Sequence, residues 1–154
     1  MTKRRYLFTI AVAISFVLLI AACSNSKNIP TRFFEDYKAT VMENSSVTDV
    51  SLLYSRPSLQ IYVRVPNAIG EEEMAQILEL TKSFVTIEKM NEIEGYINQG
   101  STIRDVYLAI MNNEDSTSLR VYETGYYKGY ETDKSSENID GYKTWSDSEI
   151  VWKD

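Results

Sequence analysis

Residues 47–65 read VTDVSLLYSRPSLQIYVRV and contain two runs in which apolar and polar side chains alternate. A period of two is the pattern of a β-strand with one buried face, so residues 48–55 and 59–65 are predicted strands. The short connection Arg56-Pro57-Ser58 predicts that they form a hairpin. The apolar face of this hairpin needs a covering layer.

Helical patterns on either side of the hairpin supply that layer. The first opens at residues 30–31 and ends near residues 44–46, with apolar side chains on one side. The second begins at the three glutamates 71–73 and stops at Gly100. Its apolar phase drifts along the way, so we expect a kink or break near Thr86.

Residues 103–122 repeat the pattern of the first hairpin. Residues 103–108 align with 47–52, and residues 118–122 align with 58–62. Each hairpin also follows a helical pattern, which predicts a duplicated α-β-β unit. Chance or shared strand propensity is the alternative explanation of the match.

The order α-β-β-α-β-β over residues 31–125 predicts an α+β domain of two layers, a four-stranded antiparallel sheet with helices on one face. This order resembles a circular permutation of the ferredoxin-like fold, and the resemblance implies that strands 59–65 and 119–124 are central neighbours. Residues 126–154 form a Tyr- and Gly-rich loop and an irregular C-terminal segment, which we expect to dock on the domain. The apolar residues expected to make that contact are Tyr142, Trp145, Ile150, Val151 and Trp152.

The N-terminus has the layout of an export signal, a basic start followed by the uncharged residues 6–22. Residues 19–23, LIAAC, resemble the lipobox of bacterial lipoproteins, in which the cysteine is diacylated before cleavage. The resemblance implies a signal peptide over 1–22, lipid attachment at Cys23 and an extracytoplasmic domain anchored to the cell membrane. A retained membrane helix and an unmodified secreted protein are the alternatives. Residues 23–30 are predicted to be a flexible tether.

The charge and the missing residue types narrow the chemistry. Without residues 1–22 the chain keeps 13 Lys and Arg against 22 Asp and Glu, a formal charge of −9. This charge argues against nucleic acid or anionic lipid as the main partner, although a local basic patch remains open. The chain has no histidine and no cysteine besides Cys23. Histidine-based nucleophile arrangements and histidine zinc sites are therefore excluded.

Carboxylate, lysine or tyrosine chemistry remains for an enzyme. A carboxylate pair would need Asp49 and Asp105 close together, but the predicted strand order puts them at opposite edges of the sheet. The glutamates 71–73 could be interpreted as metal ligands, but acidic residues at the positive end of a helix are the simpler interpretation. We therefore predict no catalytic residue, no metal and no cofactor.

The predicted binding surface is the sheet face without helices. Alternation places Tyr and Arg side chains there, types that are enriched where proteins bind one another. The residues of this predicted surface are Tyr62, Arg64, Tyr107, Arg120 and Tyr122. Three interpretations stay open: a cover formed by the C-terminal segment, a protein-binding surface, or a glycan surface. A glycan surface would also draw on Tyr126, Tyr127 and Tyr130.

The sequence thus favours a lipid-anchored, non-catalytic domain that binds a protein partner at the cell envelope. Binding of cell-wall peptidoglycan is the alternative function, because tyrosine rings stack on sugar faces. A carboxylate-based hydrolase is the least favoured of the three functions. Nucleic acid is not an expected partner of an acidic domain outside the cytoplasm.

Overall fold

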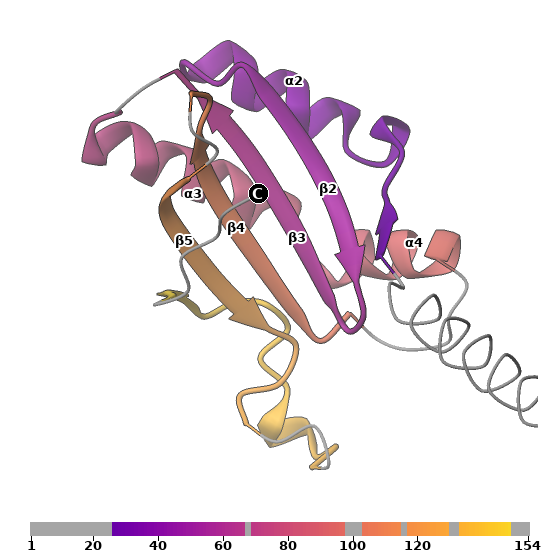
Figure 1. Cartoon of the computed structure of the whole chain (residues 1–154). Helices are drawn as coiled ribbons and strands as arrows, with labels where there is room; N and C mark the ends of the chain where they lie inside the picture. The colour runs from indigo at the N-terminus through magenta and orange to yellow at the C-terminus, as the bar shows by residue number, and fades with distance from the viewer. Residues whose placement is uncertain (1–25, 67–68, 98–102, 115–116, 130–132, 149–154) are drawn as a thin grey trace, which may run out of the picture.

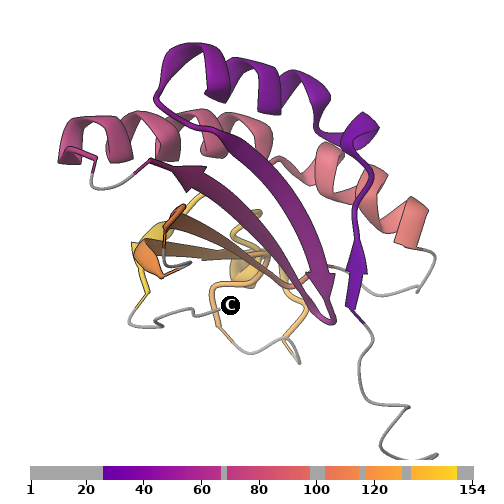
Figure 2. The same ribbon diagram turned by 45° about the horizontal axis from the view of Figure 1, so that its top comes forward.

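The computed structural model describes residues 26–66, 69–97, 103–114, 117–129 and 133–148. Within these residues a mixed six-stranded sheet forms one layer, and three α-helices form a second layer on one face of it (Figures 1 and 2). The strands are β1 (Ser26–Asn28), β2 (Asp49–Ser55), β3 (Ser58–Val65), β4 (Asp105–Asn112), β5 (Ser118–Gly125) and β6 (Trp145–Asp147). The helices are α2 (Glu35–Asn44), α3 (Glu71–Phe84) and α4 (Ile87–Ile97), with short 3₁₀ turns at Thr31–Phe33 and Ser136–Asn138. The predicted α+β class is confirmed.

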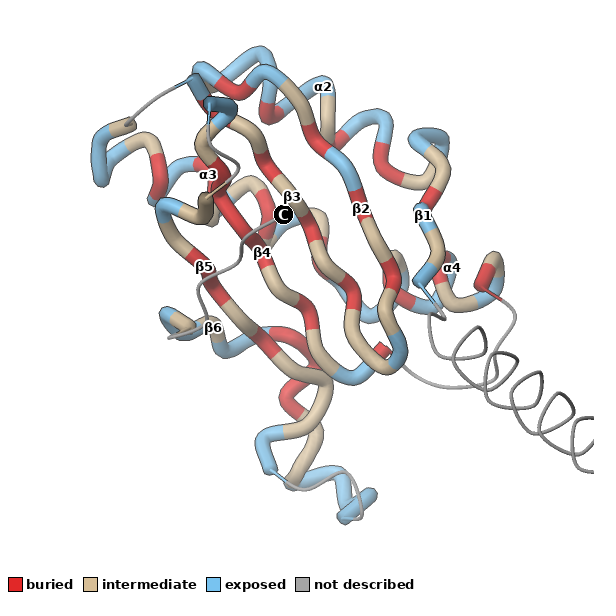
Figure 3. Tube along the Cα trace, viewed as in Figure 1, coloured by how far each residue is buried: buried red, intermediate tan, exposed pale blue. Residues whose placement is uncertain are grey.

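The first hairpin forms as its alternation predicts. Strands β2 and β3 pair antiparallel, so Leu52 lies opposite Ile61 and Tyr54 opposite Leu59 on the side of the helices. These four residues are at most 2 % exposed. The tube in Figure 3 shows the resulting alternation of buried and partly exposed residues along both strands.

The centre of the sheet differs from the prediction. Strands β3 and β4 are neighbours and run parallel, with Ile61 opposite Leu108, so the sheet is mixed and β5 does not pair with β3. The expected all-antiparallel sheet, with 59–65 beside 119–124, is therefore wrong. Helices α3 and α4 carry the chain back along the sheet, and only such a crossover lets a strand pair in parallel with its predecessor. The likeness to a permuted ferredoxin-like fold is limited to the two α+β layers.

The expected break in the long helical pattern is confirmed at Val85 and Thr86. Helix α3 ends at Phe84, and the Thr86 hydroxyl accepts a hydrogen bond from the Lys89 backbone N–H at 3.2 Å. Threonine in this role is a good helix N-cap, so α4 begins anew with its own buried face. That face consists of Met90, Ile93 and Ile97, which join the common core under the sheet.

Strand β1 occupies residues that the sequence assigns to the tether. Lys27 pairs with Tyr54 of β2, which makes β1 the edge strand of the sheet, and Ile29 is buried at 4 % exposure. The predicted tether over 23–30 is thus wrong from Ser26 onward. The polar stretch Ser26–Asn28 has no apolar alternation, because an edge strand can be held by backbone hydrogen bonds alone.

The C-terminal segment reaches the opposite edge of the sheet. Strand β6 pairs antiparallel with β5, Tyr142 is buried in the core, and Trp145 packs against that core. Ile150, Val151 and Trp152, which were expected to dock as well, lie outside the described residues.

Candidate functional site

The sheet face opposite the helices carries the candidate site. Its central row crosses three strands, with Tyr62 opposite Ala109 and Ala109 opposite Val121. In the flanking rows Arg64 lies opposite Met111, and Gln60, Tyr107 and Glu123 lie side by side. We call this surface, made of Tyr62, Arg64, Tyr107, Ala109, Met111, Val121 and their row neighbours Gln60 and Glu123, the helix-free face.

The helix-free face has its own small apolar cluster. Ala109, Met111 and Val121 are between 0 and 3 % exposed, and the half-buried rings of Tyr62 and Tyr107 pack against them. This cluster is separate from the main core, which lies on the other side of the same strands. The two tyrosines therefore form an outer layer above an apolar floor.

Polar contacts within the face orient its tyrosines. The Tyr62 hydroxyl donates a hydrogen bond to Gln60 Oε1 at 2.8 Å, along the same strand. Burial raises the pKa of the Tyr107 hydroxyl, and the nearby carboxylates of Asp105 and Glu123 raise it further. The Tyr107 hydroxyl therefore stays protonated and uncharged at physiological pH.

Two of the five predicted site residues lie on the other side of the sheet. Tyr122 lies opposite Leu108 and is 8 % exposed in the main core. Arg120 is on the same side at the sheet margin, where its guanidinium contacts the Glu71 carboxylate of α3 at 2.7 Å and Asp147 of β6 at 3.4 Å. The prediction that Arg120 and Tyr122 join Tyr62 and Tyr107 is therefore wrong.

The phase of β5 explains this error. With Arg120 and Tyr122 expected on the helix-free face, alternation puts their neighbours Leu119 and Val121 on the side of the helices. In the structure Val121 faces the small cluster on the helix-free face, and Leu119 is 37 % exposed. A register shift between Ile110 and Met111 leaves Leu119 as the extra residue of a β-bulge. Because both faces of the central strands are apolar, alternation alone did not reveal which side of β5 is inside.

A pocket of about 330 Å³ lies next to the helix-free face, where β5 meets the chain that follows it. Its walls combine aromatic rings, carboxylates and hydroxyls. The lining residues are Asp105, Tyr107, Glu123, Thr124, Gly125, Tyr127, Lys128, Asp140, Thr144 and Ser146. A lining of this composition suits a small polar ligand such as a sugar ring.

Two of the three acids that line this pocket, Asp105 and Asp140, have structural partners. Burial raises the pKa of the Asp140 carboxyl, but hydrogen bonds from the backbone and hydroxyl of Thr144 and from the backbone N–H of Lys143 outweigh it and leave the pKa below its usual value. Asp105 is paired with the Arg104 guanidinium at 2.7 Å. Asp140 thus holds the turn that leads into β6.

The carboxylate pair considered for hydrolysis does not assemble. Asp49 lies on β2 and Asp105 on β4, with β3 between them, and Asp49 is bound by Lys38 Nζ at 2.5 Å. In the described part of the chain no three Asp or Glu side chains gather closely enough to hold a metal ion. The glutamates at the start of α3 point to separate partners, Glu71 to Arg120 and Glu73 to Ser46.

The predicted signal peptide and lipid attachment at Cys23 lie outside the described residues. Tyr126 and Tyr127 are described and touch edge to face at 4.9 Å, whereas Tyr130 is not described. None of the helices in the described part of the chain has the length and hydropathy of a membrane span.

Comparisons with protein-family models, with curated proteins and with solved structures return no match for this chain.

Proposed function

We propose that this chain is a lipid-anchored, non-catalytic domain that binds a protein partner at the cell envelope through the helix-free face. The observation that supports this role is the layer of Tyr62, Tyr107 and Arg64 above the apolar floor of the face. No helix of the described residues covers that side of the sheet (Figure 2). In the proposed role the partner would contact this side of the sheet.

The composition of the face favours a protein over a small molecule. Tyrosine offers a large, rigid contact area with few rotatable bonds, and arginine adds directional donors, which is why both recur at the centres of protein interfaces. The residues come from three adjacent strands and form a broad surface rather than an enclosed cavity. A stable protein complex buries about 800 Å² per partner, so a protein partner needs a surface that spans several strands.

Photo-crosslinking in living cells tests this role. A photoreactive amino acid at Gln60, which lies half-buried at the margin of the face, should give one discrete crosslinked protein that mass spectrometry can identify. The Arg64→Glu substitution in the same chain should weaken that product by tenfold or more, because it reverses a charge within the interface. Binding of the purified candidate to the purified chain completes the test.

The matched control carries the photoreactive residue at Glu79, which is exposed on α3 on the opposite side of the molecule. Equal crosslinking from Gln60 and Glu79 would contradict a specific face. A crosslink from Gln60 to the chain's own residues 149–154 would also contradict it, because the face would then be an internal surface.

Binding of cell-wall glycan is the second candidate, and the pocket beside Tyr107 and Tyr127 favours it. The purified chain should then co-sediment with purified peptidoglycan, and Tyr127→Ala should reduce the bound fraction severalfold because a stacking ring is lost. Tyr96→Ala, far from the pocket on α4, is the control. Absence of co-sedimentation would end this candidate.

The lipid anchor has its own test. Mass spectrometry of the native protein should find Cys23 at the N-terminus with two acyl chains attached. In a Cys23→Ala variant, the domain should leave the membrane fraction. A native chain that begins elsewhere, or an unmodified Cys23, would contradict the anchor.

A further inference from the structure

A cluster of cations and aromatic rings lies where β1 meets the end of α4. Lys27 Nζ is 4.1 Å from the centroid of the Tyr96 ring and donates to the Tyr96 carbonyl at 3.3 Å. The Arg32 guanidinium lies 5.0 Å from the Phe33 ring and 5.6 Å from the Tyr96 ring. The two rings are themselves in contact, with centroids 4.9 Å apart. We call Lys27, Arg32, Phe33 and Tyr96 the basic aromatic cluster.

More cations lie at the same end of the sheet. Ser26 pairs with Ser55, so the exposed Arg56 in the β2–β3 turn is adjacent to the start of β1. The Arg104 backbone N–H donates to the Pro57 carbonyl at 2.9 Å, which brings a further exposed arginine to this turn, where its side chain is paired with Asp105. The cluster therefore continues into a wider basic end.

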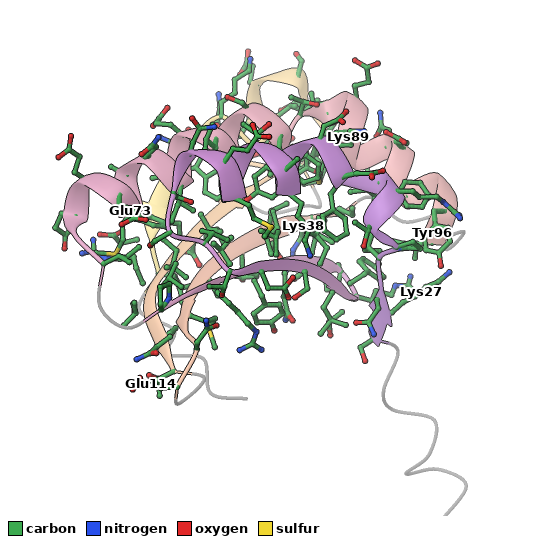
Figure 4. All side chains as sticks on the ribbon, turned by 90° about the horizontal axis from the view of Figure 1, so that it is seen from above. Lys27, Lys38, Glu73, Lys89, Tyr96 and Glu114 are labelled. Carbon is green, nitrogen blue, oxygen red and sulfur yellow. The ribbon has the colours of Figure 1, made fainter. Side chains whose placement is uncertain are left out.

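A group of glutamates lies at the opposite end of the molecule. The chain enters α3 at Glu71, Glu72 and Glu73, and Glu114 lies in the β4–β5 turn. Figure 4 shows Lys27 and Tyr96 at one end of the molecule and Glu73 and Glu114 at the other. The cations of the cluster and these glutamates thus lie at opposite ends of the molecule.

The position of β1 relates this basic end to the anchor. Only Ser24 and Asn25 separate Cys23 from Ser26, the first residue of β1. A chain spans at most about 3.6 Å per residue, so the Cα atom of Ser26 lies within about 11 Å of the Cα atom of an acylated Cys23. The lipid headgroup region is itself several ångströms thick. A domain held this closely must touch the bilayer with its β1 end.

We propose that the basic aromatic cluster, together with Arg56, is a membrane-contact surface that seats the domain on anionic lipid headgroups. The inference rests on the lipid anchor of the proposed function. Lysine and arginine beside an anionic leaflet are attracted to it, and Tyr and Phe rings suit the boundary between headgroups and acyl chains. The acidic end then points away from the membrane, where repulsion between it and the lipid is weakest.

Site-specific fluorescence on the acylated full-length mature chain in vesicles tests this surface. Acylated Cys23 cannot react with a thiol dye, so one introduced cysteine takes the label. Asn28→Cys places it in β1, and Glu114→Cys places it at the acidic end; both positions are exposed. In vesicles of phosphatidylcholine with phosphatidylglycerol, the label at position 28 should shift to shorter wavelength and be quenched by lipid-borne quencher. The label at position 114 should keep the emission wavelength of a dye in water and should not be quenched.

Charge removal then identifies the contact. The triple variant Lys27→Gln, Arg32→Gln and Arg56→Gln should favour the state in which the β1 end is in water over the seated state, in which it contacts the lipid. We expect the ratio of seated domains to domains in water to fall roughly a hundredfold at low salt, since each cation near an anionic surface raises that ratio about fivefold. Vesicles of phosphatidylcholine alone, and raised salt with the unaltered cluster, should lower it as well. These two measurements keep the test valid if the triple variant is less stable.

A control variant removes the same charge elsewhere, with Lys82, Lys89 and Lys143 each changed to Gln, and should leave the seated state unchanged. Equal signals from positions 28 and 114, or insensitivity to lipid charge, would overturn the membrane-contact surface. Mass spectrometry of the same sample separates the premises: a chain without acyl groups refutes the anchor and this inference with it, while an acylated chain with a solvated label refutes the contact surface alone. Crosslinking from Gln60 is independent of both results.

Discussion

The hydroxyl oxygen of Tyr37 on α2 lies 2.7 Å from the hydroxyl oxygen of Thr81 on α3, and both residues are buried. The Thr81 hydroxyl donates to the Ile77 carbonyl at 2.8 Å, so Tyr37 is the donor in the bond between the two side chains. This bond is a buried side-chain contact between α2 and α3. It therefore fixes how α2 and α3 meet above the sheet.

Burial of Tyr37 makes the stability of the domain sensitive to alkaline pH. Burial raises the pKa of Tyr37 far above its ordinary value of 10, although the Thr81 hydrogen bond acts in the opposite direction, and burial raises that of Tyr142 in the same way. The unfolded chain loses these protons at about pH 10, so the stability is complete below that pH and falls as the pH rises above it. Urea unfolding between about pH 8 and about pH 11 should show this decline. The Tyr37→Phe variant should decline less steeply, and identical slopes would contradict the assignment.

Two buried tyrosines should respond oppositely to the loss of their hydroxyl groups. Tyr37→Phe removes a donor from Thr81 and should cost about 1 kcal/mol of unfolding free energy. The hydroxyl of Tyr54, a residue 1 % exposed, has no hydrogen-bond partner among the described residues. Tyr54→Phe should therefore be neutral or stabilising by up to about 1 kcal/mol. Chemical unfolding of both variants at neutral pH measures the difference, and an equal loss in both would contradict it.

The bulge in β5 can be tested with two neighbouring residues. Val121 is buried on the helix-free face at 3 % exposure, whereas Leu119 is 37 % exposed. Val121→Asp should cost about 3 kcal/mol or more, because it places a charge in an apolar cluster. Leu119→Asp should stay within about 0.5 kcal/mol. Plain alternation puts both residues on the same face and predicts similar losses, so similar losses would contradict the observed register.

The features that local patterns could predict are those decided by neighbouring residues. The β2–β3 hairpin follows from the alternation in residues 47–65, and the break between α3 and α4 follows from the drift of apolar phase near Thr86. Each depends on contacts within one segment. The helices also cover one face, as the predicted two layers require.

The features that could not be predicted are set by long-range pairing. Strand β4 pairs in parallel with β3 across a helical crossover, and the residue pattern within the two strands does not indicate this pairing. Strand β1 is polar and forms only because β2 leaves an edge open. The assignment of Arg120 and Tyr122 failed because an apolar cluster on the helix-free face makes both phases of β5 acceptable.

The turn that leads into β6 depends on a glycine. Gly141 has φ +65°, and an added Cβ would lie 2.9 Å from Ile87 Cδ1. A side chain there is strained by the left-handed backbone, so Gly141→Ala should lower the unfolding free energy by about 1–2 kcal/mol. The ring of the next residue, Tyr142, lies in the core, and its hydroxyl donates a hydrogen bond to the Ile103 carbonyl. The backbone carbonyl of Tyr142 accepts a hydrogen bond from Trp145 Nε1 at 3.1 Å. A disturbed turn therefore also weakens β6, which amide hydrogen exchange should detect.

Gly95 in α4 provides the control, because an added Cβ would meet no atom within 4 Å and the residue lies within a helix. Gly95→Ala adds the same methyl group and should stabilise the protein by about 0.5–1 kcal/mol, since alanine loses less conformational entropy in a helix. Chemical unfolding should thus shift in opposite directions for the two variants. A shift of the same sign in both would show that the left-handed turn at Gly141 does not hold the C-terminal segment in place.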